Sequence, residues 1–562
     1  MNRAEPGRPW RPGFFMRRCG SAADGQSLAA FLSRSATGAC LANQWRRGAG
    51  LDRRDGRWGG PKVPRDVHQS VPLLVSHDQA IGGYDDGRSA PSARPAETDA
   101  GNFSQNIDIL QNRSMPQTVP FAALRYNLEH IGSLSDVVAP PYDVIDPELQ
   151  EQLYKRHTAN VVRVILNRTE PGDAPDANYD RAAKFVRQWI SEGVLMREES
   201  PAFYVYHQTF EVDGQTVTRR GFQGRVRTTP FGEGNIYPHE ETHPKAKVDR
   251  LKLTTATKQN NSQIFGLYPD PENQVIDLLD AATEGIQPVQ ATDHLGVLHT
   301  LWPVTDPQVI QQVSDLMMDR PMFVADGHHR YETSCNYKDQ VAAQYAAEQG
   351  GPLPEDHPAN FLMTMMVGMS DPGMVVLPTH RLLRGTPRFS SAEITAALAG
   401  VFDCELVAGG LQVAGTVWGQ METSNDQGLI GLYAVKDDSW LLCRATDQAA
   451  VRMAQIEPDK SDDWRSLGVS LLHRLVIDEL LESAGHPKPT YVHEVDEVIG
   501  GMQGQGSQAE SDGDDPYTLA ALVMPATLAH VEAISLHKER MPAKSTYFYP
   551  KLLSGLTFNP LQ

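Results

Sequence analysis

The stretch PMFVADGHHRYETSCNYKDQVAAQYAAEQGG, residues 321–351, decides the fold prediction. Its first five residues form a short apolar run that is typical of a buried strand, and the residues from Tyr331 to a Gly-Gly pair favour a helix. Residues 326–330, DGHHR, occupy the connection between them, where Gly327 permits a positive φ. The sequence therefore predicts a strand, a tight turn and a helix, with titratable side chains concentrated at the turn.

The predicted turn has the properties of an anion-binding site. The first amides of a helix point outward at the positive end of its dipole, and Arg330 can grip a phosphate through two hydrogen bonds. His328 and His329 can donate hydrogen bonds or transfer protons near neutral pH, and Asp326 can bind a metal ion or accept a proton. In the structural alternative, Asp326 caps the helix and the histidines are solvated.

The DGHHR turn, with its strand before and its helix after, resembles the motif of the free-serine kinases of the ParB/sulfiredoxin-like superfamily. This resemblance implies that the turn binds nucleotide phosphates and that a separate acidic residue activates the serine hydroxyl. It also implies phosphoryl transfer to a small hydroxylated substrate, with ATP or ADP and Mg²⁺ as cofactors.

The chain from Val119 to Leu556 also resembles a large uncharacterised bacterial family through six widely spaced landmarks. They are PFAALRYN (120–127), VVAPPYDVI (137–145), IFGLY (264–268), ADGHHRYET (325–333), LPTHRLL (377–383) and KSTYFYPKLLSGL (544–556). This second resemblance indicates membership of the family and supplies little function of its own.

The sequence HEETH, residues 239–243, matches the HExxH signature of zinc proteases, in which both histidines share one helical face. Pro238 precedes it, and Pro244 disfavours the α conformation at His243, where that helix must continue. We therefore expect a loop in which His239 and Glu240 reach into the pocket of the DGHHR turn. Whether HEETH binds a metal is left open.

Three further segments contribute candidate residues, each with a structural alternative. Lys245 and Lys247 belong to a basic run that can face a phosphate or form a solvated helix face. Tyr142 and Asp143 follow two prolines that rigidify a loop, which can be a binding loop or a structural corner. His380 and Arg381 follow an apolar run, and the tyrosines of KSTYFYPKL, which also carries Lys544 and Lys551, can line a ligand or pack in a core.

Composition excludes several classes of protein. The net charge is −19, and residues 1–114 hold 16 Lys and Arg against 11 Asp and Glu, which leaves 35 against 59 for the remainder. Such an acidic body argues against nucleic-acid binding. There is no apolar run near the roughly 18 residues of a membrane-spanning helix, and no Walker A or GxGxxG sequence. Five scattered cysteines without a CxxC pair fit a reducing cytoplasm.

The expected organisation is an α+β fold in two units. Residues 1–114 are expected to be a disordered leader or a mis-assigned start, 115–350 an N-terminal α/β unit with the DGHHR site, and 351–562 a C-terminal α+β unit with a flexible loop at 499–516. The patterns also predict a helix over 180–197, a hairpin at Asp213-Gly214, a hairpin around residue 437 and a long helix from Trp464 to Gly485.

These observations favour a cytoplasmic, nucleotide-dependent phosphotransferase that acts on a small hydroxylated metabolite such as serine. The alternatives are a metal-dependent hydrolase and a nucleotide-sensing protein without turnover, and the oligomeric state is open. The residues expected to carry the chemistry fall into three groups, namely catalytic Asp326, His328, His329 and Glu240; phosphate-binding Gly327, Arg330, Lys245, Lys247 and Arg381; and pocket-lining Tyr142, Asp143, His239 and His380.

Overall fold

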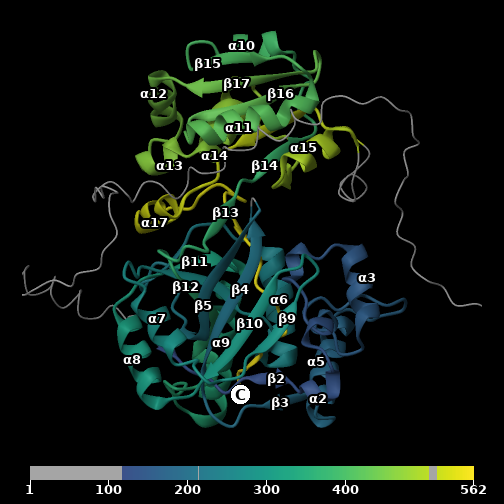
Figure 1. The fold of residues 1–562 in the computed structure, drawn as a ribbon, viewed down its shortest axis with the longest axis vertical. Coiled ribbons are helices and arrows are strands. Elements are labelled where there is room, and N and C mark those ends of the chain that lie inside the picture. The colour runs from purple at the N-terminus through teal and green to yellow at the C-terminus, as the bar shows by residue number, and fades with distance from the viewer. Residues whose placement is uncertain (1–116, 213, 505–514) are drawn as a thin grey trace, which may run out of the picture. The chain divides into compact units, whose positions relative to one another are not determined.

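The computed structural model describes residues 117–212, 214–504 and 515–562. These residues fall within one compact unit, Arg94–Gln562. They form a mixed α+β fold with one nine-stranded sheet, one six-stranded sheet and three two-stranded pairs, as the sequence predicts (Figure 1). The expected leader 1–114, Asp213 of the first hairpin and residues 505–514 of the expected loop lie outside the described residues.

The nine-stranded sheet carries the DGHHR turn. Its order is β6-β11-β8-β12-β5-β4-β10-β9, and β1 pairs with β5. The strands are β1 (Thr118–Val119), β4 (Phe203–Val212), β5 (Gln215–Arg227), β6 (Ile236–Pro238), β8 (Ile264–Tyr268), β9 (Val289–Thr292), β10 (Leu298–Val304), β11 (Met322–Asp326) and β12 (Phe361–Gly368). Because β6 and β11 are parallel neighbours, their carboxyl ends meet at the same edge of the sheet.

Helices cover this sheet. Successive side chains of β11 point to opposite faces of the sheet and pack into two separate apolar clusters. Met322 and Val324 pack into a cluster with apolar residues of α7 and α8, whereas Phe323 and Ala325 face the cluster that contains Phe548. The helical segments of this part are α2 (Leu128–Ile131), η1 (Leu134–Asp136), η2 (Tyr142–Val144), α3 (Pro147–Arg156), α4 (Val162–Ile165), α5 (Ala177–Ser191), α6 (Pro244–Thr257), α7 (Gln274–Ala281), α8 (Pro307–Met318), α9 (His328–Gln349) and η3 (Pro358–Asn360).

The six-stranded sheet is antiparallel throughout, in the order β15-β17-β16-β19-β14-β18. Its strands are β14 (His380–Leu383), β15 (Phe402–Val407), β16 (Leu429–Ala434), β17 (Ser439–Ala445), β18 (Thr490–Val492) and β19 (Leu519–Val523). The accompanying helical segments are α10 (Ser391–Leu398), η4 (Leu411–Val413), α11 (Ala414–Ser424), α12 (Asp447–Ile456), α13 (Asp462–Ser466), α14 (Gly468–Ser470), the π-helix η5 (Leu471–Leu480), α15 (Val495–Met502) and α17 (Leu528–Leu536).

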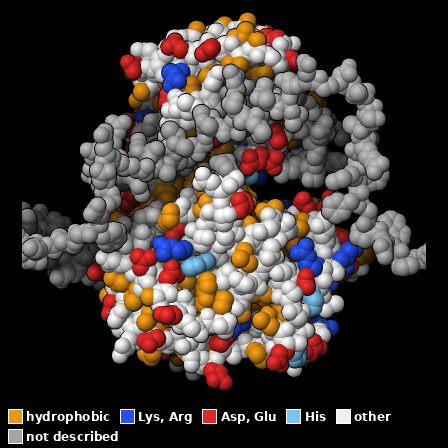
Figure 2. Space-filling view, viewed as in Figure 1, with side chains coloured by type: hydrophobic (Ala, Val, Ile, Leu, Met, Phe, Trp, Pro, Cys, Tyr) orange, Lys and Arg blue, Asp and Glu red, His pale blue; other side chains and the backbone are white. Residues whose placement is uncertain are grey.

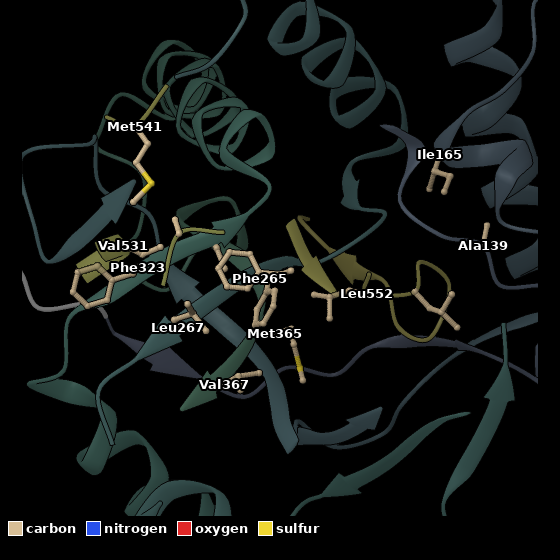
Figure 3. Close-up of a cluster of buried hydrophobic side chains, with 14 of the residues drawn as sticks. Ala139, Ile165, Phe265, Leu267, Phe323, Met365, Val367, Val531, Met541 and Leu552 are labelled. Atoms are coloured by element: carbon tan, nitrogen blue, oxygen red, sulfur yellow. The ribbon is translucent and has the colours of Figure 1, made fainter. Parts of the chain in front are cut away.

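The segment after α17 returns to the first sheet. The two-stranded pairs are β2 (Leu124–Tyr126) with β3 (Leu195–Arg197), β13 (Val375–Leu377) with β20 (Tyr547–Tyr549), and β7 (Gln259–Asn260) with β21 (Asn559–Pro560). Figure 3 shows Met541 and Leu552 of this segment in the same buried cluster as Phe265 and Phe323. The fully buried Arg219 donates hydrogen bonds to the carbonyls of Tyr549 and Pro550. The C-terminal segment is therefore part of the core.

Both predicted hairpins are present, as β4–β5 and β16–β17. The helix predicted over 180–197 is shorter, because α5 ends at Ser191 and Gly193 adopts a φ of 72° before β3 begins. The helical spacing of its apolar residues also predicts that Ile190 packs with Val186 and Trp189, but Ile190 is 44% exposed. The buried residues of α5 are Ala182, Ala183, Val186 and Trp189, without Ile190.

The single helix predicted from Trp464 to Gly485 is interrupted. The backbone is extended at Leu467, so that α13 ends there and α14 begins, and the continuation is a π-helix. Gly468 lies against the backbone of Gln427, where an added Cβ would be 2.9 Å from the carbonyl oxygen. This close tertiary contact explains the break, which amphipathic periodicity alone does not reveal.

The division expected between residues 350 and 351 remains a prediction. On the C-terminal side of that division, β12 pairs with β5 and β8 of the first sheet, and β21 pairs with β7. Within the described ranges, no helix is long and apolar enough to cross a bilayer. Figure 2 shows acidic and basic side chains interspersed on the face in view.

Candidate functional site at the DGHHR turn

The strand, turn and helix predicted around DGHHR are confirmed. β11 ends at Asp326, Gly327 caps the next helix with a φ of 97°, and α9 begins at His328, three residues earlier than the sequence suggested. A Cβ on Gly327 would lie 2.8 Å from Cγ2 of Ile264, so that both the conformation and the space require glycine. The first amide bonded within the helix is that of Tyr331, which donates to the Gly327 carbonyl, and the preceding amides point out of the helix end.

Asp326 holds two cationic side chains at the turn. The Nζ of Lys551 lies 3.0 Å from Oδ2 of Asp326, and Nη2 of Arg330 lies 3.7 Å from its Oδ1. Arg330 is fixed from a second side, because its Nη1 donates to Oγ of Ser262 at 3.2 Å. Burial by itself raises the pKa of Asp326, but Lys551, Arg330 and Lys544 outweigh it, and the net shift is downward. Asp326 therefore stays ionised and fixes the positions of the Lys551 and Arg330 side chains.

The pKa of Glu240 is shifted in the opposite direction to that of Asp326. It follows β6 at the same sheet edge as Asp326, and it forms a parallel bridge with Met541. Within the described part of the chain, its carboxylate has no hydrogen bond or ion pair, although its backbone carbonyl accepts one from Arg540 at 2.7 Å. Burial raises the pKa of Glu240, the charges of Asp326 and Asp143 add to this, and Lys544 and Lys551 oppose it. A carboxyl group in this setting is suited to accept a proton.

The paired histidines of DGHHR hold the HEETH segment through its backbone. The Nε2 of His328 accepts a hydrogen bond from the backbone N–H of His239 at 3.2 Å, and the Nε2 of His329 accepts one from that of His243 at 2.8 Å. The rings of His239 and His328 also meet edge to face, with their centroids 4.7 Å apart. Glu240 lies between the two anchored residues, so the two motifs form one structure.

Burial keeps these histidines neutral. It lowers the pKa of His239 to about 4, and it lowers that of His328 as well. The Nδ1–H of His239 donates to the carbonyl of Val324 at 2.8 Å, and its Nε2 contacts Oγ1 of Thr546 at 2.9 Å. His239 thus links β11 to the C-terminal segment and is fully buried.

The HEETH segment is extended and does not have the geometry of a zinc protease. His243 has extended backbone angles and caps α6, which starts at Pro244 as the flanking prolines predict. The two histidines therefore do not share a helical face. Across the described ranges, no group of three or more His, Cys, Asp or Glu side chains is arranged to hold a metal ion. Of the two predicted lysines of α6, Lys247 pairs with Glu332 at 3.1 Å, and Lys245 is exposed.

The loop of residues 140–143, named the PPYD loop after its sequence, lies beside the turn. Tyr142 packs beneath the guanidinium group of Arg250, whose Cζ lies 3.9 Å from the ring centroid. Burial raises the pKa of Tyr142, and the charges of Asp143, Arg330 and Asp326 also act on it. Asp143 is exposed and acts electrostatically on His329 and Glu240. The structure thus brings both loop residues into the surroundings of the site.

The predicted pair His380 and Arg381 is divided between the two faces of β14, as expected for neighbours on a strand. Arg381 is fully buried, donates to the carbonyl of Lys544 at 2.8 Å, and also contacts Nε2 of His473 at 3.2 Å. Burial lowers its pKa to about 10, while Glu240 acts to raise it. His380 instead packs against Trp418, with the ring centroids 4.8 Å apart, in the core of the six-stranded sheet.

Three residues of the C-terminal segment lie at the turn, Lys544, Tyr547 and Lys551, although the sequence indicated only that the tyrosines of KSTYFYPKL can line a ligand or pack in a core. Lys544 and Lys551 supply positive charge, and Lys551 also lies 4.3 Å from the ring centroid of Tyr547. His493 also stacks on the Tyr547 ring, with the ring centroids 3.6 Å apart. The signal in the sequence was two lysines inside an otherwise aromatic and apolar closing segment. The pairing of Lys551 with Asp326 could not be predicted, because the two residues are 225 positions apart in the sequence.

One cavity lies at the turn, and another lies beside β6. One, of about 40 Å³, is lined by Arg250, Ser262, Arg330 and Thr333 among others. The second, of about 150 Å³, lies between β6 and the residues after α17, and its lining includes Phe231 and Arg540. Arg540 lines this second cavity and donates a hydrogen bond to the backbone carbonyl of Glu240.

Fold and site together define an α+β protein with a cation-rich strand–turn–helix at one sheet edge. The chain belongs to the family described as Protein of unknown function (DUF1015), whose model matches residues 118–470. No curated protein matches the chain.

Solved structures that resemble the chain include two of free serine kinase. A mutant in complex with ADP has 9% identity and a TM-score of 0.25 over 56% of this chain and 84% of that one, and an AMP complex has 10% identity and a TM-score of 0.25 over 56% and 83%. A conserved hypothetical protein from Pyrococcus furiosus has 10% identity and a TM-score of 0.25 over 57% and 89%.

Proposed function

We propose that the protein is a nucleotide-dependent phosphotransferase that acts on a small hydroxylated metabolite such as free serine. The observation that carries this proposal is the contrast between Glu240 and Asp326 at one sheet edge. Glu240 has a raised pKa, and its carboxylate has no hydrogen bond or ion pair within the part of the chain that the structure describes, whereas Asp326 is ionised and holds Lys551 and Arg330. A proton acceptor beside a phosphate-sized group of cations and helix amides is what phosphoryl transfer needs.

In this proposal the phosphates of the nucleotide bind at the start of α9. The outward amides of residues 328–330 donate hydrogen bonds, and the Arg330 and Lys551 side chains add charge-assisted ones. Their positions are set in advance, because Asp326 and Ser262 hold Arg330, and Asp326 and the Tyr547 ring hold Lys551. Preorganised donors stabilise charge that develops during reaction without having to reorient.

Glu240 acts as the general base. Its carboxylate takes the proton of the acceptor hydroxyl as that oxygen attacks the terminal phosphorus atom of ATP or ADP. The bond from this phosphorus to the bridging oxygen breaks, and the nucleotide leaves with the bonding electrons as ADP or AMP, its charge stabilised by Arg330 and Lys551. His328 and His329 contribute by fixing the backbone on either side of Glu240.

Mg²⁺ fits this scheme as a partner of the nucleotide. When bound with the nucleotide, it would neutralise charge on the phosphates, and Asp326 or Glu240 would hold it. Asp326 is already paired with Arg330 and Lys551. The positive charge that the protein itself provides at the turn comes from these two side chains and from Lys544.

Phosphorus NMR tests the proposal. The protein is incubated with Mg²⁺, ATP or ADP and a pool of serine and related hydroxy acids, beside Glu240→Gln and Arg330→Ala. We expect a new phosphomonoester signal in the wild type and a rate at least about 100-fold lower in Glu240→Gln, which is the lower range for loss of a general base. Glu211→Gln, a change at an exposed residue near the end of the largely buried β4, is the control and should keep the wild-type rate.

The absence of any phosphomonoester at saturating nucleotide would overturn the proposal for these acceptors. Nucleotide binding that raises the melting temperature without turnover would then favour a sensor. Hydrolytic activity without nucleotide would favour the hydrolase.

A further inference from the structure

A second chemically distinctive pair of side chains lies in the six-stranded sheet. Cys404 of β15 and Cys443 of β17 are directly opposite each other in the antiparallel register, and their sulfur atoms are 2.7 Å apart. Cys443 is fully buried, and Cys404 is partly exposed. No residue of the DGHHR site contacts either sulfur through a hydrogen bond within the described part of the chain.

The backbone geometry suits a covalent bond between the two. Residues directly opposite in an antiparallel pair have Cβ atoms about 4.5–5.5 Å apart, and a disulfide needs about 3.5–4.5 Å, so closure requires only a small inward shift. β15 can make that shift because it is the edge strand of the sheet and has β17 as its single neighbour there. Both sulfurs already lie on the same face, since the two residues occupy one register position.

We propose that Cys404 and Cys443 are a redox-active dithiol that closes to a reversible cross-strand disulfide on reaction with a two-electron oxidant, hydrogen peroxide or a small disulfide. With peroxide, the Cys404 thiolate attacks one oxygen, the O–O bond breaks, and the departing hydroxide takes a proton to become water. The Cys443 sulfur then attacks the sulfenic sulfur of Cys404, loses its proton, and releases a second water. Two thiols are oxidised and one peroxide is reduced.

The order of attack follows from exposure. Cys404 is the accessible sulfur, and its hydrogen bond with Cys443 lowers its pKa, which favours the reactive thiolate. The same contact raises the pKa of Cys443, with burial adding to the shift, so Cys443 is suited to the second step. Cys335 provides an internal comparison, because burial raises its pKa to about 12 and its Sγ donates a hydrogen bond to the carbonyl of Thr229.

The test is peptide mapping of the full-length protein. Samples are treated with a reductant, with equimolar hydrogen peroxide or with oxidised glutathione, then alkylated and digested without reduction. We expect a cross-linked peptide pair that contains Cys404 and Cys443, about 2 Da lighter than the sum of the reduced peptides and lost on reduction. Cys335→Ser should leave it unchanged, and Cys404→Ser should abolish it.

A melting experiment gives an independent measure. Closing the loop between the two residues should raise the melting temperature of the oxidised wild type by about 4 °C or more over the reduced protein, and Cys404→Ser should show no such difference. The proposal is overturned if both cysteines remain fully alkylatable after oxidant, if Cys404 proceeds to sulfinic acid without a cross-link, or if it pairs with another cysteine. None of these outcomes bears on phosphoryl transfer.

Discussion

At the scale of single residues, Asp326 and Glu240 share one sheet edge, yet their pKa values move in opposite directions. Lys551 and Arg330 contact the Asp326 carboxylate, whereas the half-buried carboxylate of Glu240 has no hydrogen bond or ion pair among the described residues. Pairs of carboxyl groups whose environments separate their pKa values identify which one can accept a proton. The sequence left Asp326 and Glu240 as equal candidates for the base, and the contacts favour Glu240.

The raised pKa of Glu240 predicts a displaced pH profile. The ionised form is required for proton abstraction, so kcat/KM should increase with pH through the raised pKa and be lost below it, at a higher pH than for an ordinary glutamate. The free energy of unfolding changes with pH in the opposite direction to the activity. The folded state binds the Glu240 proton more tightly than the unfolded state does, so ionisation of Glu240 lowers stability as pH rises.

Glu240→Gln should consequently lower activity and raise the melting temperature at pH 8, and the gain should shrink towards pH 4. Thermal melts across this range, beside a pH–rate profile of the wild type, measure both effects. An unchanged or lower melting temperature at pH 8 would contradict a destabilising negative charge at Glu240.

At the scale of elements, the strand–turn–helix could be predicted because each part has a local signal. An apolar run, a glycine that accepts positive φ and a helix-prone run stand in order, and the prolines flanking HEETH correctly predicted that it is not a helix. The mutual support of the two motifs could not be predicted. It depends on β6 and β11 being parallel neighbours, although about 85 residues separate them in sequence.

Gly327→Ala tests the turn, with Gly232→Ala as a matched control. Both glycines have a left-handed φ, 97° and 94°, but an added Cβ meets Ile264 at Gly327 and nothing within 4 Å at Gly232. The control should cost about 1 kcal/mol for conformation alone, and Gly327→Ala about 2–4 kcal/mol, through the added clash. Urea unfolding of both variants measures the difference, and equal losses would show that the packing at the turn is not as described.

At the scale of the whole molecule, the site depends on segments that lie at opposite ends of the described chain. The PPYD loop lies beside the turn, and the C-terminal segment brings Lys544 and Lys551 to it. β14 contributes Arg381, which donates to the backbone of Lys544. Composition and periodicity predicted an α+β fold, but they contain no information on which distant segments of the chain contact each other. The cationic half of the site was therefore only partly predicted, through Arg330 and Arg381.

Nucleotide binding by a Lys551→Met variant tests most directly whether phosphate binds at the DGHHR turn. Calorimetric titration with ADP should give a Kd about 10–100-fold weaker than that of the wild type, as expected for loss of one charge-assisted hydrogen bond. Lys436→Met, which removes an exposed lysine paired with Glu393, should bind as the wild type does. Equal affinities for the wild type and Lys551→Met, with both proteins folded by thermal melting, would contradict a phosphate site at this turn.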